Sequence, residues 1–202
     1  MFSQLPTPEQ IRSDWGDRVL AGIAGSVESA RDDFREFRDL KPEWMVDMSS
    51  RTTAGFIHDR IVSELRHRLD GIDGVSIVGY EPLCEIVIGN TYSVRVKRHG
   101  PGDVVSSYPT LTALEFWGNE PPMPGFEHWN LAAGYRWDPD SREMGDAVLS
   151  FRLGMRKVLW AISIAASSGS VAGFSWNPIE PQLPDLDLSR IDRPVEERES
   201  WA

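Results

Sequence analysis

Apolar residues near the N-terminus recur at steps of three or four and predict one long amphipathic helix. Residues 7–10 (Thr-Pro-Glu-Gln) form its start signal, with Thr as N-cap and Pro at the first helical position. The helix is expected to end near residue 40, before Lys41 and Pro42. Glycines within it predict a break near residues 22–26. The apolar stripe consists of Ile11, Trp15, Val19, Ile23, Val27, Ala30, Phe34 and Phe37.

A second helix is predicted over residues 51–69. Ser49 and Ser50 provide the start signal, and Asp70 with Gly71 ends the pattern. Its expected buried stripe consists of Ala54, Ile57, Ile61, Leu65 and Leu69.

Alternating patterns then predict strands over residues 75–78, 84–88 and 92–97. Gly89 and Asn90 favour a tight two-residue hairpin between the last two strands. In that register Glu85 lies opposite Val94 and points away from the side chains of Arg95 and Lys97.

The second half of the chain predicts a short helix and three further strands. Thr110 is the N-cap of the helix over residues 111–117, and the strands cover about 129–137, 147–153 and 158–164. The order predicts an α+β fold: a mainly antiparallel sheet of about six strands, with the N-terminal helices packed on one face.

Composition divides the chain into three predicted parts. Residues 1–41 form an N-terminal amphipathic helical segment, residues 42–166 an α+β core domain, and residues 167–202 a flexible tail rich in proline and acids. The tail alternates Leu and Ile with Asp, a pattern typical either of a groove-docking segment or of a frayed terminus.

Several protein classes are excluded by composition. No apolar run reaches the ~20 residues of a membrane helix, and the N-terminus lacks the pattern of a signal peptide. The single cysteine, Cys84, permits no internal disulfide and no multi-cysteine zinc site, and it is expected to be a packed thiol. These features predict a cytoplasmic protein without metal, cofactor or membrane contact.

Charge is distributed unevenly along the chain. The formal net charge is −10, which argues against binding of nucleic acid over the whole surface. Residues 51–100 nevertheless hold seven Arg and Lys against six acids, together with three of the four histidines. This island is either an ordinary solvated surface or a site for an anion.

Arg51 and His58 are the first candidate site residues. They lie two turns apart on one helix face, with Gly55 between them, so a cation and an imidazole flank a position without a side chain. A ligand oxygen can approach there closely; the alternative is that Gly55 permits tight packing and His58 bonds to a neighbouring loop.

Arg95 and Lys97 are the second pair, on one face of the predicted strand with Ser93. Our first hypothesis is a recognition module in which Arg51, His58, Arg95 and Lys97 bind a phosphate, a nucleic-acid backbone or an acidic stretch of a protein partner. It requires that no acid lies among these cations.

Two alternatives remain open. In the first, the protein is an enzyme acting on nucleic acid or a nucleotide without metal, with His58 as general acid or base and the cations stabilising phosphate charge. In the second, the long first helix and the acidic tail mediate self-association, which allows a homo-oligomer, or neutralise a partner.

Two resemblances bear on function. The segments RTTAGFIHDRI, YSVRVKR, YPTLTALEF and AAGYRWD resemble uncharacterised bacterial and phage proteins of toxin–antitoxin or mobile-element settings, which implies a phage-defence context and no mechanism. The order helix, three strands, helix, strand resembles the core of PD-(D/E)xK nucleases, whose acids hold Mg²⁺. Here Arg95 stands where that family has a metal-binding acid, Glu85 is expected on the wrong face, and only Glu64 remains.

Overall fold

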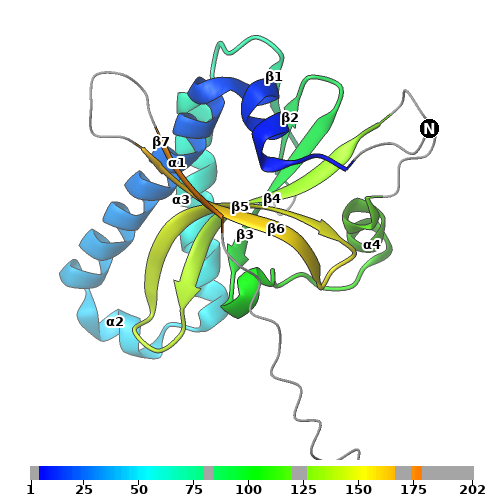
Figure 1. Cartoon of the computed structure of the whole chain (residues 1–202). Helices are drawn as coiled ribbons and strands as arrows, with labels where there is room; N and C mark the ends of the chain where they lie inside the picture. The colour runs from blue at the N-terminus through cyan, green and yellow to red at the C-terminus, as the bar shows by residue number, and fades with distance from the viewer. Residues whose placement is uncertain (1–4, 80–83, 120–126, 167–173, 179–202) are drawn as a thin grey trace, which may run out of the picture.

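A computed structural model describes residues 5–79, 84–119, 127–166 and 174–178 (Figure 1). Three helices come first: α1 (Pro8–Leu40), α2 (Pro42–Asp47) and α3 (Ser50–Arg68). They are followed by β1 (Val75–Val78), β2 (Glu85–Ile88), β3 (Tyr92–His99), the 3₁₀ turn η1 (Pro101–Asp103), α4 (Leu111–Gly118), β4 (Trp129–Asp138), β5 (Glu143–Leu153), β6 (Lys157–Ala166) and β7 (Phe174–Pro178).

The predicted helix starts are confirmed by their capping hydrogen bonds. Thr7 accepts from the backbone N–H of Gln10 at 3.3 Å, and Ser49 accepts from that of Thr52 at 3.1 Å. Thr110 caps α4 in the same way. Local side-chain chemistry therefore sets where each of these helices begins.

The expected break in α1 near residues 22–26 is wrong. The helix continues through that stretch, and the only residue with non-helical backbone angles is Gly16 (φ 71°, ψ 165°). Gly22 and Gly25 instead allow α3 to pack closely, because a Cβ on Gly22 would lie 2.7 Å from Cδ2 of Leu69. Contact with α3 explains why these glycines remain helical.

Among the described residues, the sheet has seven strands in sequence order, β1 to β7, and is mainly antiparallel as predicted. Within this described sheet only β3 and β4 run parallel, and α4 lies on the connection between them. The seventh strand, β7, pairs with β6 and falls in the stretch assigned to the tail, so residues 174–178 are not part of a structureless segment. The rest of the predicted tail, 167–173 and 179–202, lies outside the described residues.

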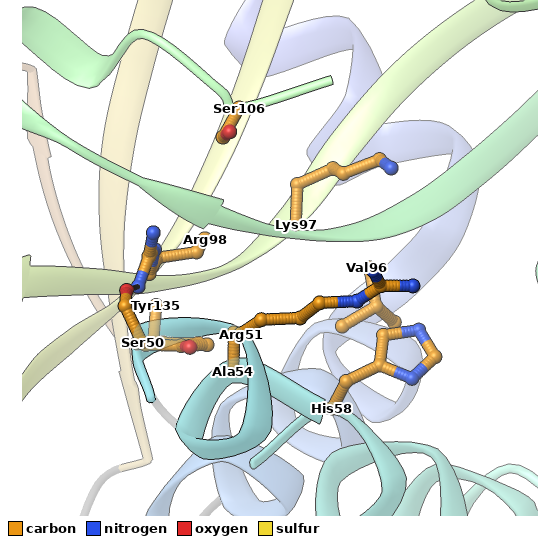
Figure 2. Close-up of a pocket in the computed structure, with 9 residues that line it drawn as sticks. All are labelled: Ser50, Arg51, Ala54, His58, Val96, Lys97, Arg98, Ser106 and Tyr135. Carbon is orange, nitrogen blue, oxygen red and sulfur yellow. Dashed lines mark hydrogen bonds between the residues drawn. The ribbon is translucent and has the colours of Figure 1, made fainter. Parts of the chain in front are cut away.

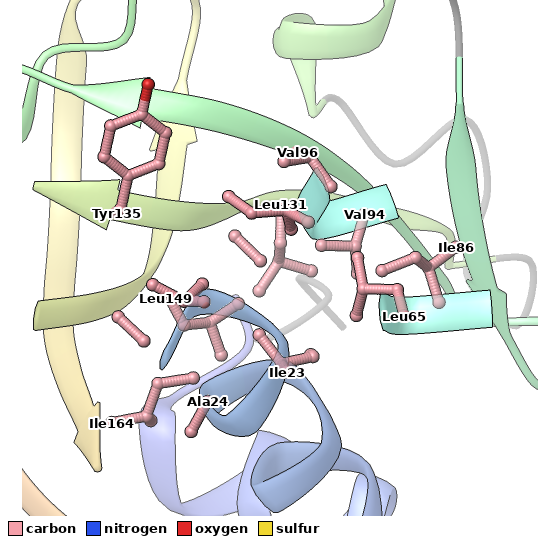
Figure 3. Close-up of a cluster of buried hydrophobic side chains, with 14 of the residues drawn as sticks. Ile23, Ala24, Leu65, Ile86, Val94, Val96, Leu131, Tyr135, Leu149 and Ile164 are labelled. Carbon is pink, nitrogen blue, oxygen red and sulfur yellow. The ribbon is translucent and has the colours of Figure 1, made fainter. Parts of the chain in front are cut away.

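One hydrophobic core joins the N-terminal helices to the sheet (Figure 3). It includes Ile23 of α1, Leu65 of α3, Val94 of β3 and Leu149 of β5, each at most 1% exposed. The α4 helix packs on the opposite face, where Phe116 and Trp117 cluster with Ala132. The segment 1–41 is therefore packed, over its described residues, into the same core as the sheet.

No helix among the described residues combines the length and the apolar character needed to cross a membrane.

Candidate functional site

The α3 helix carries Arg51 and His58 on the side away from its buried stripe. Thr53, Ile57 and Ile61 anchor the helix to the core, each at most 1% exposed. Gly55 lies between the two candidates, and no heavy atom would come within 4 Å of a Cβ placed on it. The position is therefore open and does not serve tight packing.

Along one edge of its C-terminal half, strand β3 has no pairing strand among the described residues. Its register with β2 runs from Tyr92 to Arg95, and Val105 forms a single antiparallel bridge with His99. Between them, residues 96–98 pair with β4 on one side and with no described strand on the other. This open edge lies beside α3 and is where a groove forms.

All four predicted residues line this groove. Arg51 and His58 from α3 and Arg95 and Lys97 from β3 surround a hollow of about 630 Å³, which falls within the ~300–1,000 Å³ of typical ligand sites. An adjoining hollow of about 410 Å³ shares Arg51, His58 and Lys97 and adds three residues: Ser50, Arg98 and Tyr135 (Figure 2). Figure 2 shows Arg51 extended toward the His58 ring on one side of β3, whereas the side chain of Lys97 extends from the other side of the strand.

The predicted orientation of Glu85 is wrong. The hairpin loop has three residues, Gly89, Asn90 and Thr91, so Ile88 pairs with Tyr92 and Glu85 lies opposite Arg95. One additional loop residue shifts the register by one and moves each β2 side chain to the other face. Glu85 consequently lies on the same face as Arg95 and Lys97.

Arg95 is a structural cation. Both its Nε (2.9 Å) and its Nη2 (2.5 Å) donate to Oε1 of Glu85, and its guanidinium lies 3.7 Å from the ring centroid of Phe116. The residue is only 6% exposed. The requirement that no acid lies among the four cations is therefore not met at Arg95, whose charge is neutralised by Glu85.

Arg51 and Lys97 differ from Arg95 because neither has a hydrogen-bonding or ion-pair partner among the described residues. Burial of the Lys97 ammonium lowers its pKa, and repulsion from Arg95 lowers it further. A bound anion would oppose both effects, since opposite charge favours the protonated form of lysine.

His58 is held by an acid of its own helix. Its Nδ1 lies 3.3 Å from Oδ1 of Asp59, and the side chain is 28% exposed. Nε2 has no partner among the described residues. The imidazole thus has one nitrogen near a carboxylate and one nitrogen available to a ligand.

Arg98 and Ser106 belong to the site but were not predicted. The Nη1 of Arg98 donates to Oγ of Ser50 at 3.2 Å, and its guanidinium lies 5.7 Å from the ring centroid of Trp137. Strict alternation places Arg98 on the strand face opposite Lys97. The groove admits both because it wraps around the open strand edge, a feature that alternation alone does not reveal.

Cys84 lies at the floor of the groove and is 6% exposed. Burial raises the pKa of its thiol, with Arg66 opposing and Glu85 adding to the shift. Because the thiolate is the reactive form, these surroundings favour a packed thiol over a nucleophile.

The described residues contain no group of three or more His, Cys, Asp or Glu side chains that could hold a metal ion. The two acids considered for a nuclease-type metal site have other partners, since Glu85 binds Arg95 and Glu64 lies 3.3 Å from Nε of Arg68. In comparisons with known proteins, no family model, curated protein or solved structure matches the chain.

Proposed function

We propose that this protein is a recognition module that binds an anionic ligand, or an acidic segment of a partner protein, in the groove between α3 and β3. One observation carries the proposal: Arg51 and Lys97 come from separate elements, line the same hollow and have no acidic partner among the described residues. Cations that line a groove and are not paired with a carboxylate are typical of sites for phosphate or carboxylate ligands.

The local charge supports this proposal. The charges of Arg95 and Glu85 cancel each other. Apart from His58, the remaining charged residues of the groove are three cations, Arg51, Lys97 and Arg98, and one acid, Asp59. The chain as a whole carries −10. A positive groove in a negative molecule directs an anion to one place, because the surrounding surface repels it.

Arg95 acts through its neighbours in this proposal. Its pair with Glu85 and its contact with Phe116 fix the β3 backbone beside Lys97. Arg51, Lys97 and Arg98 supply the charge, and His58 and Ser106 supply further hydrogen-bonding groups. A cytoplasmic location and a toxin–antitoxin or phage-defence setting stay predictions.

The test removes the two unpaired cations and nothing else. The double variant Arg51→Gln/Lys97→Gln is compared with Arg156→Gln/Lys157→Gln, which loses the same charge from exposed positions on the β5–β6 turn. Calorimetric titrations use inorganic pyrophosphate and a short polyglutamate peptide at low ionic strength, where screening is weak.

Native protein is expected to bind at least one of the two probes. Each charge-assisted hydrogen bond contributes ~1.5–3 kcal/mol, so loss of both cations weakens binding ~100-fold or more, while the control stays near native. Equal losses in the two double variants, or no binding by native protein, would refute the proposal.

A second candidate function is metal-independent catalysis on a nucleotide or nucleic acid. The observation that favours it is the contact of His58 with Asp59, which leaves Nε2 available for proton transfer in a groove that also holds Arg51. Expression that is toxic for the native sequence and harmless for His58→Ala supports catalysis. Equal growth of the two strains, with no cleavage of RNA or DNA in the presence of a chelator, argues against it.

A third candidate is self-association or partner neutralisation through the long first helix and the acidic tail. The apolar stripe of α1 is packed in the core, and residues 179–202 of the tail lie outside the described ranges. Deleting residues 179–202 and measuring the oligomer size in solution tests it. An unchanged mass would remove this stretch from consideration as an assembly device.

A further inference from the structure

Tyr108 exposes a large aromatic surface at the end of the groove that Arg51 and Lys97 line. The residue is 84% exposed, and its ring contacts no other aromatic ring among the described residues. Its backbone is nevertheless fixed, because its carbonyl accepts from the N–H of Thr110 at 2.8 Å and Thr110 caps α4. The backbone thus places the residue at the groove, and the surface of its ring is open to a ligand.

Between this ring and the cations lie hydroxyl groups. Ser106 and Ser107 directly precede Tyr108 and line the same hollow as Lys97. Beyond Lys97, the groove continues past Arg98 into a further hollow of about 250 Å³ beside Trp137. An aromatic surface, hydroxyls and cations therefore follow one another along the groove.

Single-stranded nucleic acid fits this arrangement better than a duplex. Sites for single strands combine a cationic groove that follows the phosphates with aromatic rings on which bases stack. A duplex keeps its bases stacked inside, so it cannot place one on Tyr108. It would also bring its charge against the surface of a protein with a net charge of −10.

An acidic peptide fits less well. Its carboxylates can pair with Arg51 and Lys97, but Asp and Glu side chains present no flat π surface to Tyr108. The aromatic surface would stay exposed, which is unfavourable for so large an apolar group.

We propose that the groove binds single-stranded nucleic acid, with a backbone phosphate held by Arg51 and Lys97 and the adjoining base stacked on Tyr108. This inference rests on the proposed anion-binding function of the same groove. It adds the class of ligand and gives Tyr108 a role that charge alone does not require.

The test separates stacking from charge. Fluorescence anisotropy measures the binding of a labelled oligothymidylate and of an abasic phosphodiester oligomer of equal length. The variants are Tyr108→Ala, Tyr108→Phe and, as a matched control, Trp44→Ala, which removes another exposed aromatic ring, on α2, that lines neither hollow of the groove.

Stacking of one base contributes ~1–3 kcal/mol, so Tyr108→Ala is expected to weaken oligothymidylate binding ~5- to 150-fold. Tyr108→Phe and Trp44→Ala keep native affinity, and binding of the abasic oligomer is unchanged in all three variants. That pattern supports the inference.

The other outcomes overturn it in distinguishable ways. If the abasic oligomer binds as tightly as oligothymidylate and Tyr108→Ala changes neither, stacking is refuted while anion binding stands. If polyglutamate displaces oligothymidylate at lower concentration, or duplex DNA binds more tightly than the single strand, the ligand class is wrong. If neither oligomer nor pyrophosphate binds, both proposals fail.

Discussion

The ion pair between Glu85 and Arg95 connects the register of the β2–β3 hairpin to the wall of the groove, and we expect the two residues to be strongly coupled energetically. Their side chains are 20% and 7% exposed. With charge centres ~4 Å apart and an effective dielectric constant of ~20, the attraction is ~4 kcal/mol before desolvation is subtracted. Removing only one partner leaves a buried charge, so Glu85→Gln is expected to lower the free energy of unfolding by ~2–4 kcal/mol.

A double-mutant cycle isolates the pair. Urea denaturation of Glu85→Gln, Arg95→Gln and the double variant gives the coupling energy, and we expect ~1.5–3 kcal/mol. The double variant is expected to be more stable than the sum of the single losses indicates, because no lone charge is left buried. A coupling below ~0.5 kcal/mol, the value for independent sites, would refute the pairing and with it the three-residue loop.

Three further predictions concern the strands around the groove. Gly134→Ala is expected to lower the free energy of unfolding, measured by thermal denaturation, by ~3 kcal/mol or more, because the new Cβ would lie 1.9 Å from the carbonyl oxygen of Lys97. For the control Gly145→Ala, whose Cβ would come no closer than 3.4 Å to its nearest neighbour, the loss of stability should be far smaller. Arg152→Met is expected to change stability by less than ~1 kcal/mol or to raise it, because this fully buried guanidinium leaves Nε and Nη1 without partners; a loss of ~3 kcal/mol would contradict this reasoning. The midpoint of Lys97, dimethylated with ¹³C and followed by NMR, is expected to lie below that of free dimethyl-lysine, because burial of the ammonium lowers its pKa. The cost of burying this charge is fully present below the lowered pKa and is relieved as pH rises through it; a midpoint at or above the free value would contradict this reasoning.

The helices were predictable because their signals are local. The capping residues Thr7, Ser49 and Thr110 directly precede their helices, and the apolar residues that follow recur at helical spacing. The sequence did not predict that α1 continues through Gly22, because this course depends on packing against Leu69, the C-cap residue of α3. The low intrinsic helix propensity of glycine has a weaker effect than such tertiary contacts.

The sequence selected residues that line the groove, but it did not predict which of them pair with one another. Helical spacing and strand alternation selected Arg51, His58, Arg95 and Lys97, and all four line one hollow. The role of Arg95 changed because Thr91 belongs to the loop, and a single loop residue reverses which face Glu85 occupies. Dipeptide signals such as Gly-Asn identify a turn but do not fix its length.

The sequence also did not predict that one edge of β3 lacks a pairing strand among the described residues. Among the described residues, the register with β2 ends at Arg95, and Val105 returns to pair with His99. These pairings involve segments outside β3, so the periodicity within β3 cannot reveal them. Arg98 was overlooked for this reason.

The central claim is that the groove between α3 and β3 binds anions through Lys97. The most direct measurement is NMR of the three ¹³C-dimethylated lysines during titration with pyrophosphate, with the Lys97→Gln variant assigning the signal. The account predicts that the Lys97 signal shifts and that its pKa rises, while the signals of Lys41 and Lys157 stay in place. Equal shifts of all three signals, or a stationary Lys97 signal at saturating pyrophosphate, would contradict it.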